Sequence, residues 1–173
     1  IRVLFRSKMH RGYSKERYLE KIDLIRSINK DVSLTSDIIV GFPSETDKDF
    51  EDTLEVVRYS KFDSVYMFKF SPRPGTPAFD MFDKFVEKKV IDERFNKLKE
   101  IQTEISTERY SRFVGTHQKI LIENQSKKDQ NVLSGKIDSG QITHIMETGI
   151  NFGDLVDVKI YDSTPFYLKA KLI

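Results

Sequence analysis

The stretch TSDIIVGFPSET, residues 35–46, decides the fold of the first part of the chain. Its apolar run Ile38–Val40 is typical of a strand that is buried on both faces of a parallel sheet. The loop Gly41–Thr46 follows, and residues 47–60 then place apolar side chains at helical spacing behind an acidic first turn. The stretch therefore predicts a strand, a loop and a helix, in that order.

The same alternation continues on both sides of this stretch. The apolar spacing predicts a helix over 14–29, a strand over 32–40, a helix over 47–60, a strand over 62–70 and a helix over 92–113. We interpret residues 1–114 as the C-terminal part of an α/β barrel with parallel strands. Two strands and three helices cannot cover both faces of a sheet. The chain also begins, at Ile1, in the middle of this alternation of helices and strands. We therefore expect it to be a piece of a longer protein.

The spacing of the apolar residues changes after Gly115. Five short alternating segments follow, at 119–123, 132–137, 141–146, 155–160 and 167–172, with glycines between them. Short strands at this spacing predict a small all-β antiparallel barrel over residues 115–173. We place the domain boundary near Val114–Gly115.

Composition narrows the possible functions. The 173 residues include 29 basic and 27 acidic side chains, so a net charge of +2 gives no global field for nucleic acid and any such binding needs a local patch. No apolar run approaches the roughly 20 residues of a membrane helix, and the N-terminus has no signal core, so the cytoplasm is the default location. With no cysteine, this chain cannot form a disulfide, a thiolate zinc site or a cysteine-held iron–sulfur cluster. Three dispersed histidines give no metal site.

Several motifs resemble one enzyme family. Residues 35–46, residues 71–78 (SPRPGTPA) and residues 9–13 (MHRGY) are similar to strand-end motifs of radical S-adenosylmethionine (SAM) methylthiotransferases, in the same order and spacing. Residues 126–129 (SKKD) and 133–136 (LSGK) resemble the opening of the family's C-terminal TRAM domain, an OB-like RNA-binding barrel. The resemblance covers essentially the whole chain. Within the family, the sequences of residues 71–78 and 126–129 are most similar to those of the MiaB type.

This resemblance implies an activity for a longer parent enzyme. A MiaB-type enzyme adds a methylthio group to isopentenylated adenosine next to the tRNA anticodon, with SAM and two 4Fe–4S clusters as cofactors. One cluster would cleave SAM to a deoxyadenosyl radical, the tRNA anticodon stem-loop would be the partner, and the parent would be a monomer. The family's cluster cysteines are absent here, so we expect this chain alone to be inactive. Lys136 is also the only basic residue directly after the TRAM glycine, where the family has a basic residue and a hydroxyl.

The resemblance and the strand-end positions together give candidate SAM-binding residues. Gly41 lacks a Cβ and could let a ligand approach the backbone. Arg73 lies between two prolines, and its guanidinium could bind the SAM carboxylate or a tRNA phosphate. The alternatives are a plain strand-to-helix turn and a surface arginine, and Glu45 is interpreted as a helix cap and as a secondary site candidate. The full candidate set is Arg11, Asp37, Gly41, Phe42, Pro43, Ser71 and Arg73, with no catalytic side chain and no metal ligand.

Four lysines form the candidate RNA-binding set: Lys119, Lys127, Lys128 and Lys136. Residues 115–136 hold these four lysines and two acids, whereas the whole barrel has seven of each, so the patch depends on placement. The alternative is a solubilising lysine loop. Two other functions stay open: a relative that acts on a ribosomal protein or another tRNA adenosine, and a non-catalytic RNA-binding piece.

Overall fold

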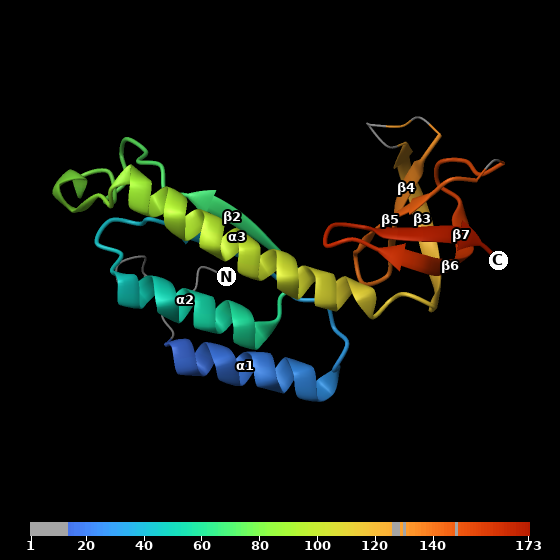
Figure 1. Cartoon of the computed structure of the whole chain (residues 1–173), viewed down its shortest axis with the longest axis horizontal. Coiled ribbons are helices and arrows are strands. Elements are labelled where there is room, and N and C mark those ends of the chain that lie inside the picture. Colours follow the sequence, from blue (N-terminus) through green and yellow to red (C-terminus); the bar gives the residue numbers. More distant parts are fainter. Residues whose placement is uncertain (1–13, 126–128, 130, 148) are drawn as a thin grey trace. The chain divides into compact units, whose positions relative to one another are not determined.

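The computed structural model describes residues 14–125, 129, 131–147 and 149–173 (Figure 1). The chain divides into two compact units, of which the first ends at Thr103 and the second begins at Glu104. This division lies within helix α3, Lys88–Ser111, whereas the boundary proposed from the sequence follows the end of that helix.

The first unit has the expected order of helix, strand, helix, strand and helix. Its elements are α1 (Lys15–Ile28), β1 (Thr35–Val40), α2 (Asp47–Ser60), β2 (Ser64–Lys69), a short 3₁₀ helix η1 (Phe82–Lys84) and α3 (Lys88–Ser111). Helix α2 has the predicted bounds. Helix α3 begins four residues earlier than the predicted start at Asp92, and the additional turn includes Ile91, which packs beside Gly41.

The two strands pair in parallel, with Thr35 opposite Ser64 and Val40 opposite Lys69. The expectation that β1 is buried on both faces is wrong, because its residues alternate between exposed and buried. Ile38 and Val40 face the helices and are buried, whereas the other face carries Tyr66 and Phe68, whose side chains are 63% and 51% exposed. The alternation of Tyr66, Phe68 and Phe70 along the strand predicted over 62–70 is more often typical of core residues than of a stacking surface, and for the first two rings the expectation of a core position is wrong, because both are exposed.

Helix α2 begins at a complete capping box. The Thr46 hydroxyl accepts a hydrogen bond from the Asp49 N–H at 3.2 Å, and the Asp49 carboxylate accepts one from the Thr46 N–H at 2.9 Å. The cap is therefore Thr46, and the interpretation of Glu45 as the cap is wrong. Helix α1 is joined to α2 by Lys15, whose ammonium group lies 2.8 Å from the Asp52 carboxylate.

The second unit is a closed five-stranded barrel. Its strands are β3 (His117–Gln125), β4 (Leu133–Ile137), β5 (Ile142–Ile145), β6 (Leu155–Ser163) and β7 (Leu168–Leu172), in the order β3-β4-β5-β7-β6. The five predicted strands are confirmed. Four of the pairings are antiparallel as expected, whereas β5 and β7 run parallel.

The barrel interior is apolar and closely packed. Ile120, Ile145 and Leu168 are fully buried, together with Tyr110 and other residues of the same core. Gly135 of β4 is required there because a Cβ at this position would lie 2.1 Å from the Leu121 carbonyl oxygen of β3. Among the helices of the described residues, none has the length and apolar character needed to cross a bilayer.

Candidate functional site

The ends of β1 and β2 meet at one edge of the small sheet. Because the strands are parallel, the loops that begin at Gly41 and at Ser71 leave from the same edge. The ladder extends to Phe70, whose N–H donates to the Val40 carbonyl at 2.8 Å. The Phe70 ring also packs edge-to-face on Phe42, with centroids 5.4 Å apart. The structure therefore brings together the two loops that the sequence selected.

Gly41 has a conformation that only glycine adopts readily. Its φ is +79°, and a Cβ would lie 2.4 Å from Cγ1 of Ile91 on α3. Its N–H donates to Oε2 of Glu45 at 2.9 Å. The space that the missing Cβ leaves open is thus occupied by the protein itself. In this chain the glycine serves the packing of α3 on the loop, and its assignment to a ligand stays a prediction.

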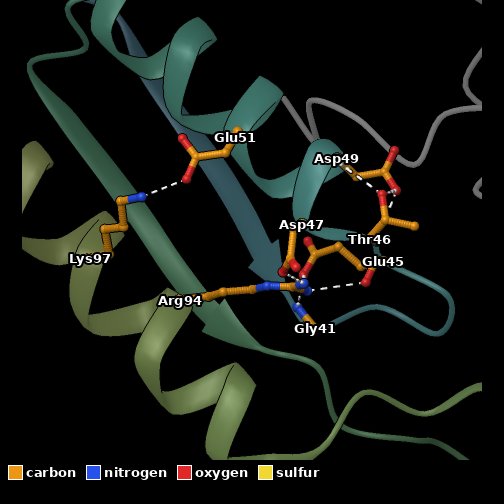
Figure 2. Close-up of polar contacts among 8 residues, drawn as sticks. All are labelled: Gly41, Glu45, Thr46, Asp47, Asp49, Glu51, Arg94 and Lys97. Atoms are coloured by element: carbon orange, nitrogen blue, oxygen red, sulfur yellow. Dashed lines mark hydrogen bonds and ion pairs between the residues drawn. The ribbon is translucent and has the colours of Figure 1, made fainter.

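A buried ion pair fixes the same loop (Figure 2). Nη1 of Arg94 on α3 lies 2.7 Å from Oε2 of Glu45 and also donates to the Glu45 carbonyl at 3.1 Å. Nη2 of Arg94 binds Oδ1 of Asp47 at 2.7 Å. The Glu45 and Arg94 side chains are only 5% and 8% exposed. One guanidinium therefore connects α3 to both the loop and the first residue of α2.

The electrostatics of this pair follow from its burial. Burial raises the pKa of Glu45, while the hydrogen bonds from the Gly41 N–H and Arg94 oppose that rise. Burial alone would lower the pKa of Arg94, but its hydrogen bonds to Asp47 and Glu45 prevail and the pKa is raised. The guanidinium also lies over the Phe50 ring, 5.6 Å from its centroid. The pair positions the loop, and the charges of Glu45 and Arg94 are both engaged within the protein.

The other candidates for the SAM pocket are exposed or lie outside the described residues. Asp37 points to the exposed face of β1, in register with Tyr66. Ser71 and Arg73 are exposed, and the Arg73 carbonyl accepts hydrogen bonds from the N–H and hydroxyl of Thr76 at 3.2 and 2.8 Å. Phe42 and Pro43, in contrast, are buried with Gly41, and Arg11 lies outside the described residues.

The candidate RNA-binding lysines that are described are already paired. Lys119 on β3 lies 2.8 Å from Asp157 on β6, and Lys136 on β4 lies 2.9 Å from Glu123 on β3. Lys127 and Lys128 lie outside the described residues. Neighbouring carboxylates therefore neutralise both described lysines of this set, and the lysine set as an RNA-binding site stays a prediction.

Sequence reasoning did not find Arg94. The signal was present, because Arg94 falls at helical spacing between Ile91 and Leu98, on the face of α3 that packs inward. A charged residue on such a face needs a buried partner. The sequence could not identify that partner, because Glu45 is 49 positions away.

Within the described stretches, no group of three or more histidine, aspartate or glutamate side chains is arranged to hold a metal ion. Iron–sulfur clusters are held by thiolates, and the chain has no cysteine. The donor set of this chain therefore does not fit an iron–sulfur cluster.

Comparisons with known proteins identify both parts of the chain. The radical SAM superfamily matches residues 2–57, which include the loop Gly41–Thr46, and the TRAM domain matches residues 111–173, which include the barrel. A tRNA-2-methylthio-N(6)-dimethylallyladenosine synthase from Mycobacterium marinum is 41% identical over 94% of this chain and 32% of its own length. This chain is homologous to the radical SAM methylthiotransferases.

Synthases with the same name from other bacteria are also similar to this chain. Those of Clostridium botulinum and Aquifex aeolicus are each 39% identical, over 96% and 95% of this chain and 37% of their own length. The chain thus spans about a third of the length of the curated relatives it matches. The resemblance inferred from the motifs is confirmed.

Proposed function

We propose that the protein carrying this chain is a tRNA methylthiotransferase that acts on isopentenylated adenosine beside the anticodon. The observation that carries the proposal is 39–41% identity to synthases of that name across 94–96% of the chain. This chain would supply part of the SAM pocket and the barrel that holds the RNA. The reaction would take place in the cytoplasm, in a monomer.

The exposed face of the small sheet supports the SAM-binding part of the proposal. It combines the carboxylate of Asp37 with the ring of Tyr66, and Arg73 follows the end of β2 at the adjacent edge. SAM carries a hydroxylated ribose, an adenine and a methionine carboxylate. An aspartate can accept hydrogen bonds from hydroxyls, an aromatic ring offers a flat apolar surface, and an arginine can bind a carboxylate bidentately. These residue types fit the cofactor.

The ion pair of Glu45 and Arg94 would act indirectly in this site. A ligand pocket needs loops that are held in place before the ligand arrives. The pair fixes the loop after β1 against α3, and the edge-to-face contact of the Phe42 and Phe70 rings fixes it against the loop after β2. SAM, when bound, supplies the radical and methyl chemistry of such enzymes. Any cluster would be held by thiolates from outside this chain, because its own residues do not fit one.

Nucleoside analysis of tRNA tests the proposal. Disruption of the gene that encodes this chain should abolish the methylthio form of isopentenyladenosine. Isopentenyladenosine itself should accumulate in its place, as measured by mass spectrometry of digested tRNA. Ribosomal proteins from the same cells serve as the control and should keep their masses. Unchanged methylthiolation of tRNA, or a mass loss only in a ribosomal protein, would overturn the proposal.

A further inference from the structure

Three basic side chains form a row on the outside of the barrel. His117 of β3 is directly opposite Lys159 of β6, and Lys159 is directly opposite Lys171 of β7. All three are exposed. Residues directly opposite each other in an antiparallel pair lie on the same face with Cβ atoms roughly 4.5–5.5 Å apart. We call His117, Lys159 and Lys171 the basic row.

The basic row costs the barrel stability. Like charges directly opposite on neighbouring strands are destabilising, and Lys159 and Lys171 have no ion-pair partner within the described part of the chain. The nearby carboxylates are already engaged: Asp157 pairs with Lys119, and Asp162 pairs with Lys169 at 2.7 Å. These neighbouring pairs are neutral, so the row keeps a charge of +2 from its lysines.

We propose that the basic row binds the phosphate backbone of RNA. This inference rests on the proposed function, because it identifies the surface through which the barrel would hold tRNA. Two lysine ammonium groups on flexible stems can each reach a phosphate oxygen, and the imidazole of His117 adds an N–H donor. The row binds without selecting sequence, because phosphate contacts fix register and orientation only.

An acidic protein would be the other polyanionic occupant, but RNA fits this surface better. Protein interfaces bind through buried aromatic or apolar anchors in pockets. The neighbours of the basic row on and directly after the same strands are the charged side chains Lys119, Asp157 and Lys169, together with Tyr161 and Ile173, which are 51% and 69% exposed. The row itself carries charge and no apolar anchor, which is the recognition expected for a phosphodiester backbone, and an exposed aromatic ring such as that of Tyr161 can stack on an RNA base. The TRAM match across residues 111–173 contains the whole row.

The salt dependence of RNA binding tests the row. The intact chain is titrated against a fluorescently labelled tRNA anticodon stem-loop from 50 to 200 mM salt, with anisotropy as the readout. Each lost phosphate contact lowers the slope of log K against log salt by about 0.7–0.9, so the wild-type chain should lose about tenfold more affinity across this range than Lys159→Gln/Lys171→Gln. Lys159→Arg/Lys171→Arg should keep the wild-type slope.

Two controls separate contact from bulk charge and from folding. Lys48→Gln/Lys89→Gln, at exposed positions on α2 and α3, changes the net charge equally and should keep the wild-type slope. The melting temperature of Lys159→Gln/Lys171→Gln should equal or exceed that of wild type, because the substitution removes repulsion. A structural role for these lysines would instead lower it.

The outcomes distinguish the row from the proposed function. Wild-type binding with an unchanged slope in Lys159→Gln/Lys171→Gln would overturn the row and leave the proposed function standing. A wild-type chain that binds no RNA would overturn the row, whereas the proposed function is decided separately by the nucleoside analysis of tRNA. Labelled polyglutamate that binds as tightly as the stem-loop, with the same loss in the variant, would assign the row to acidic polypeptides and overturn its assignment to RNA.

Discussion

Removal of the Arg94 guanidinium should destabilise the first unit strongly. Arg94→Met keeps the apolar stem but leaves the Glu45 carboxylate buried, with the hydrogen bond from the Gly41 N–H still in place. Breaking a buried ion pair by removing one partner costs about 3–5 kcal/mol, because a buried charge loses its compensation. Both side chains are more than nine-tenths buried, so solvent screening does not reduce this figure. We expect a loss of about 3 kcal/mol or more in the free energy of unfolding.

The same helix supplies a matched control. Lys97, one turn further along α3, lies 2.5 Å from Glu51 of α2, and the two side chains are 49% and 55% exposed. Exposed pairs of this kind contribute roughly 0–1 kcal/mol, so Lys97→Met should cost little. Urea unfolding followed by far-ultraviolet circular dichroism measures both variants, since the helix signal comes mainly from the first unit. Equal losses in the two variants would refute the reasoning.

The pH dependence adds a second readout for Arg94→Met. Burial raises the pKa of Glu45 in the folded state above its ordinary 4.5, and loss of Arg94 removes a group that opposes this rise. A carboxyl group with a raised folded pKa penalises the folded state above the unfolded pKa and ceases to do so below it. The deficit of the variant should therefore be greatest near neutral pH and should shrink as the pH falls toward 4.5. Arg94→Met/Glu45→Gln should recover part of the loss at pH 7.

Three further predictions concern single residues. Gly135→Ala should cost the barrel about 3 kcal/mol or unfold it, because the new Cβ would meet the Leu121 carbonyl of β3; a melting curve equal to that of wild type would count against this packing. Burial lowers the pKa of His144 below 6.5, so the unfolded chain takes up the proton first and barrel stability should fall as the pH drops below 6.5; His144→Gln should flatten this dependence in pH-resolved melting. The hydrogen bond from Lys15 of α1 lowers the pKa of Asp52 below 3.8, so the stabilising effect of this bond should persist as the pH falls to 3.8 and disappear below it. Asp52→Asn should therefore be less stable than wild type by up to about 1 kcal/mol at pH 6, and the difference should vanish at a pH below the lowered pKa. A difference that stays constant as the pH falls would disprove the assignment.

Local signals predicted most of the secondary structure. Phe50, Leu54 and Val57 at helical spacing were enough to locate α2, because all three side chains pack on one buried face. The alternating segments after Gly115 located the barrel strands for the same reason. In both cases the pattern that defines the element is also the pattern of burial, so the sequence alone carries the information.

Features that depend on distant residues could not be predicted in this way. The run at Ile38–Val40 indicated burial on both faces, but only a partner layer can provide the second cover, and a local pattern does not contain that layer. The parallel pairing of β5 with β7 depends on chain topology. The basic row exists only through the register of three strands, since His117 and Lys171 are 54 positions apart in the sequence.

The candidate site shows the same division. Family motifs selected the loops that begin at Gly41 and Ser71, and the structure places both at one edge of the sheet. The motifs did not indicate what fixes the first loop. Ile91 and Arg94, both from α3, fix this loop. Ile91 fills the space beside Gly41, and Arg94 binds the buried charge of Glu45. A motif within the loop does not specify either contact.

The most direct test of the account is the methylthio content of tRNA from cells whose only copy of the protein carries Arg73→Ala. Loss of one bidentate contact to a carboxylate corresponds to about tenfold or more in turnover. We expect isopentenyladenosine to accumulate at the expense of its methylthio form, with normal protein levels, while Arg58→Ala at an exposed position of α2 leaves the tRNA fully modified. Full methylthiolation in cells with Arg73→Ala would contradict the assignment of the sheet edge to SAM binding.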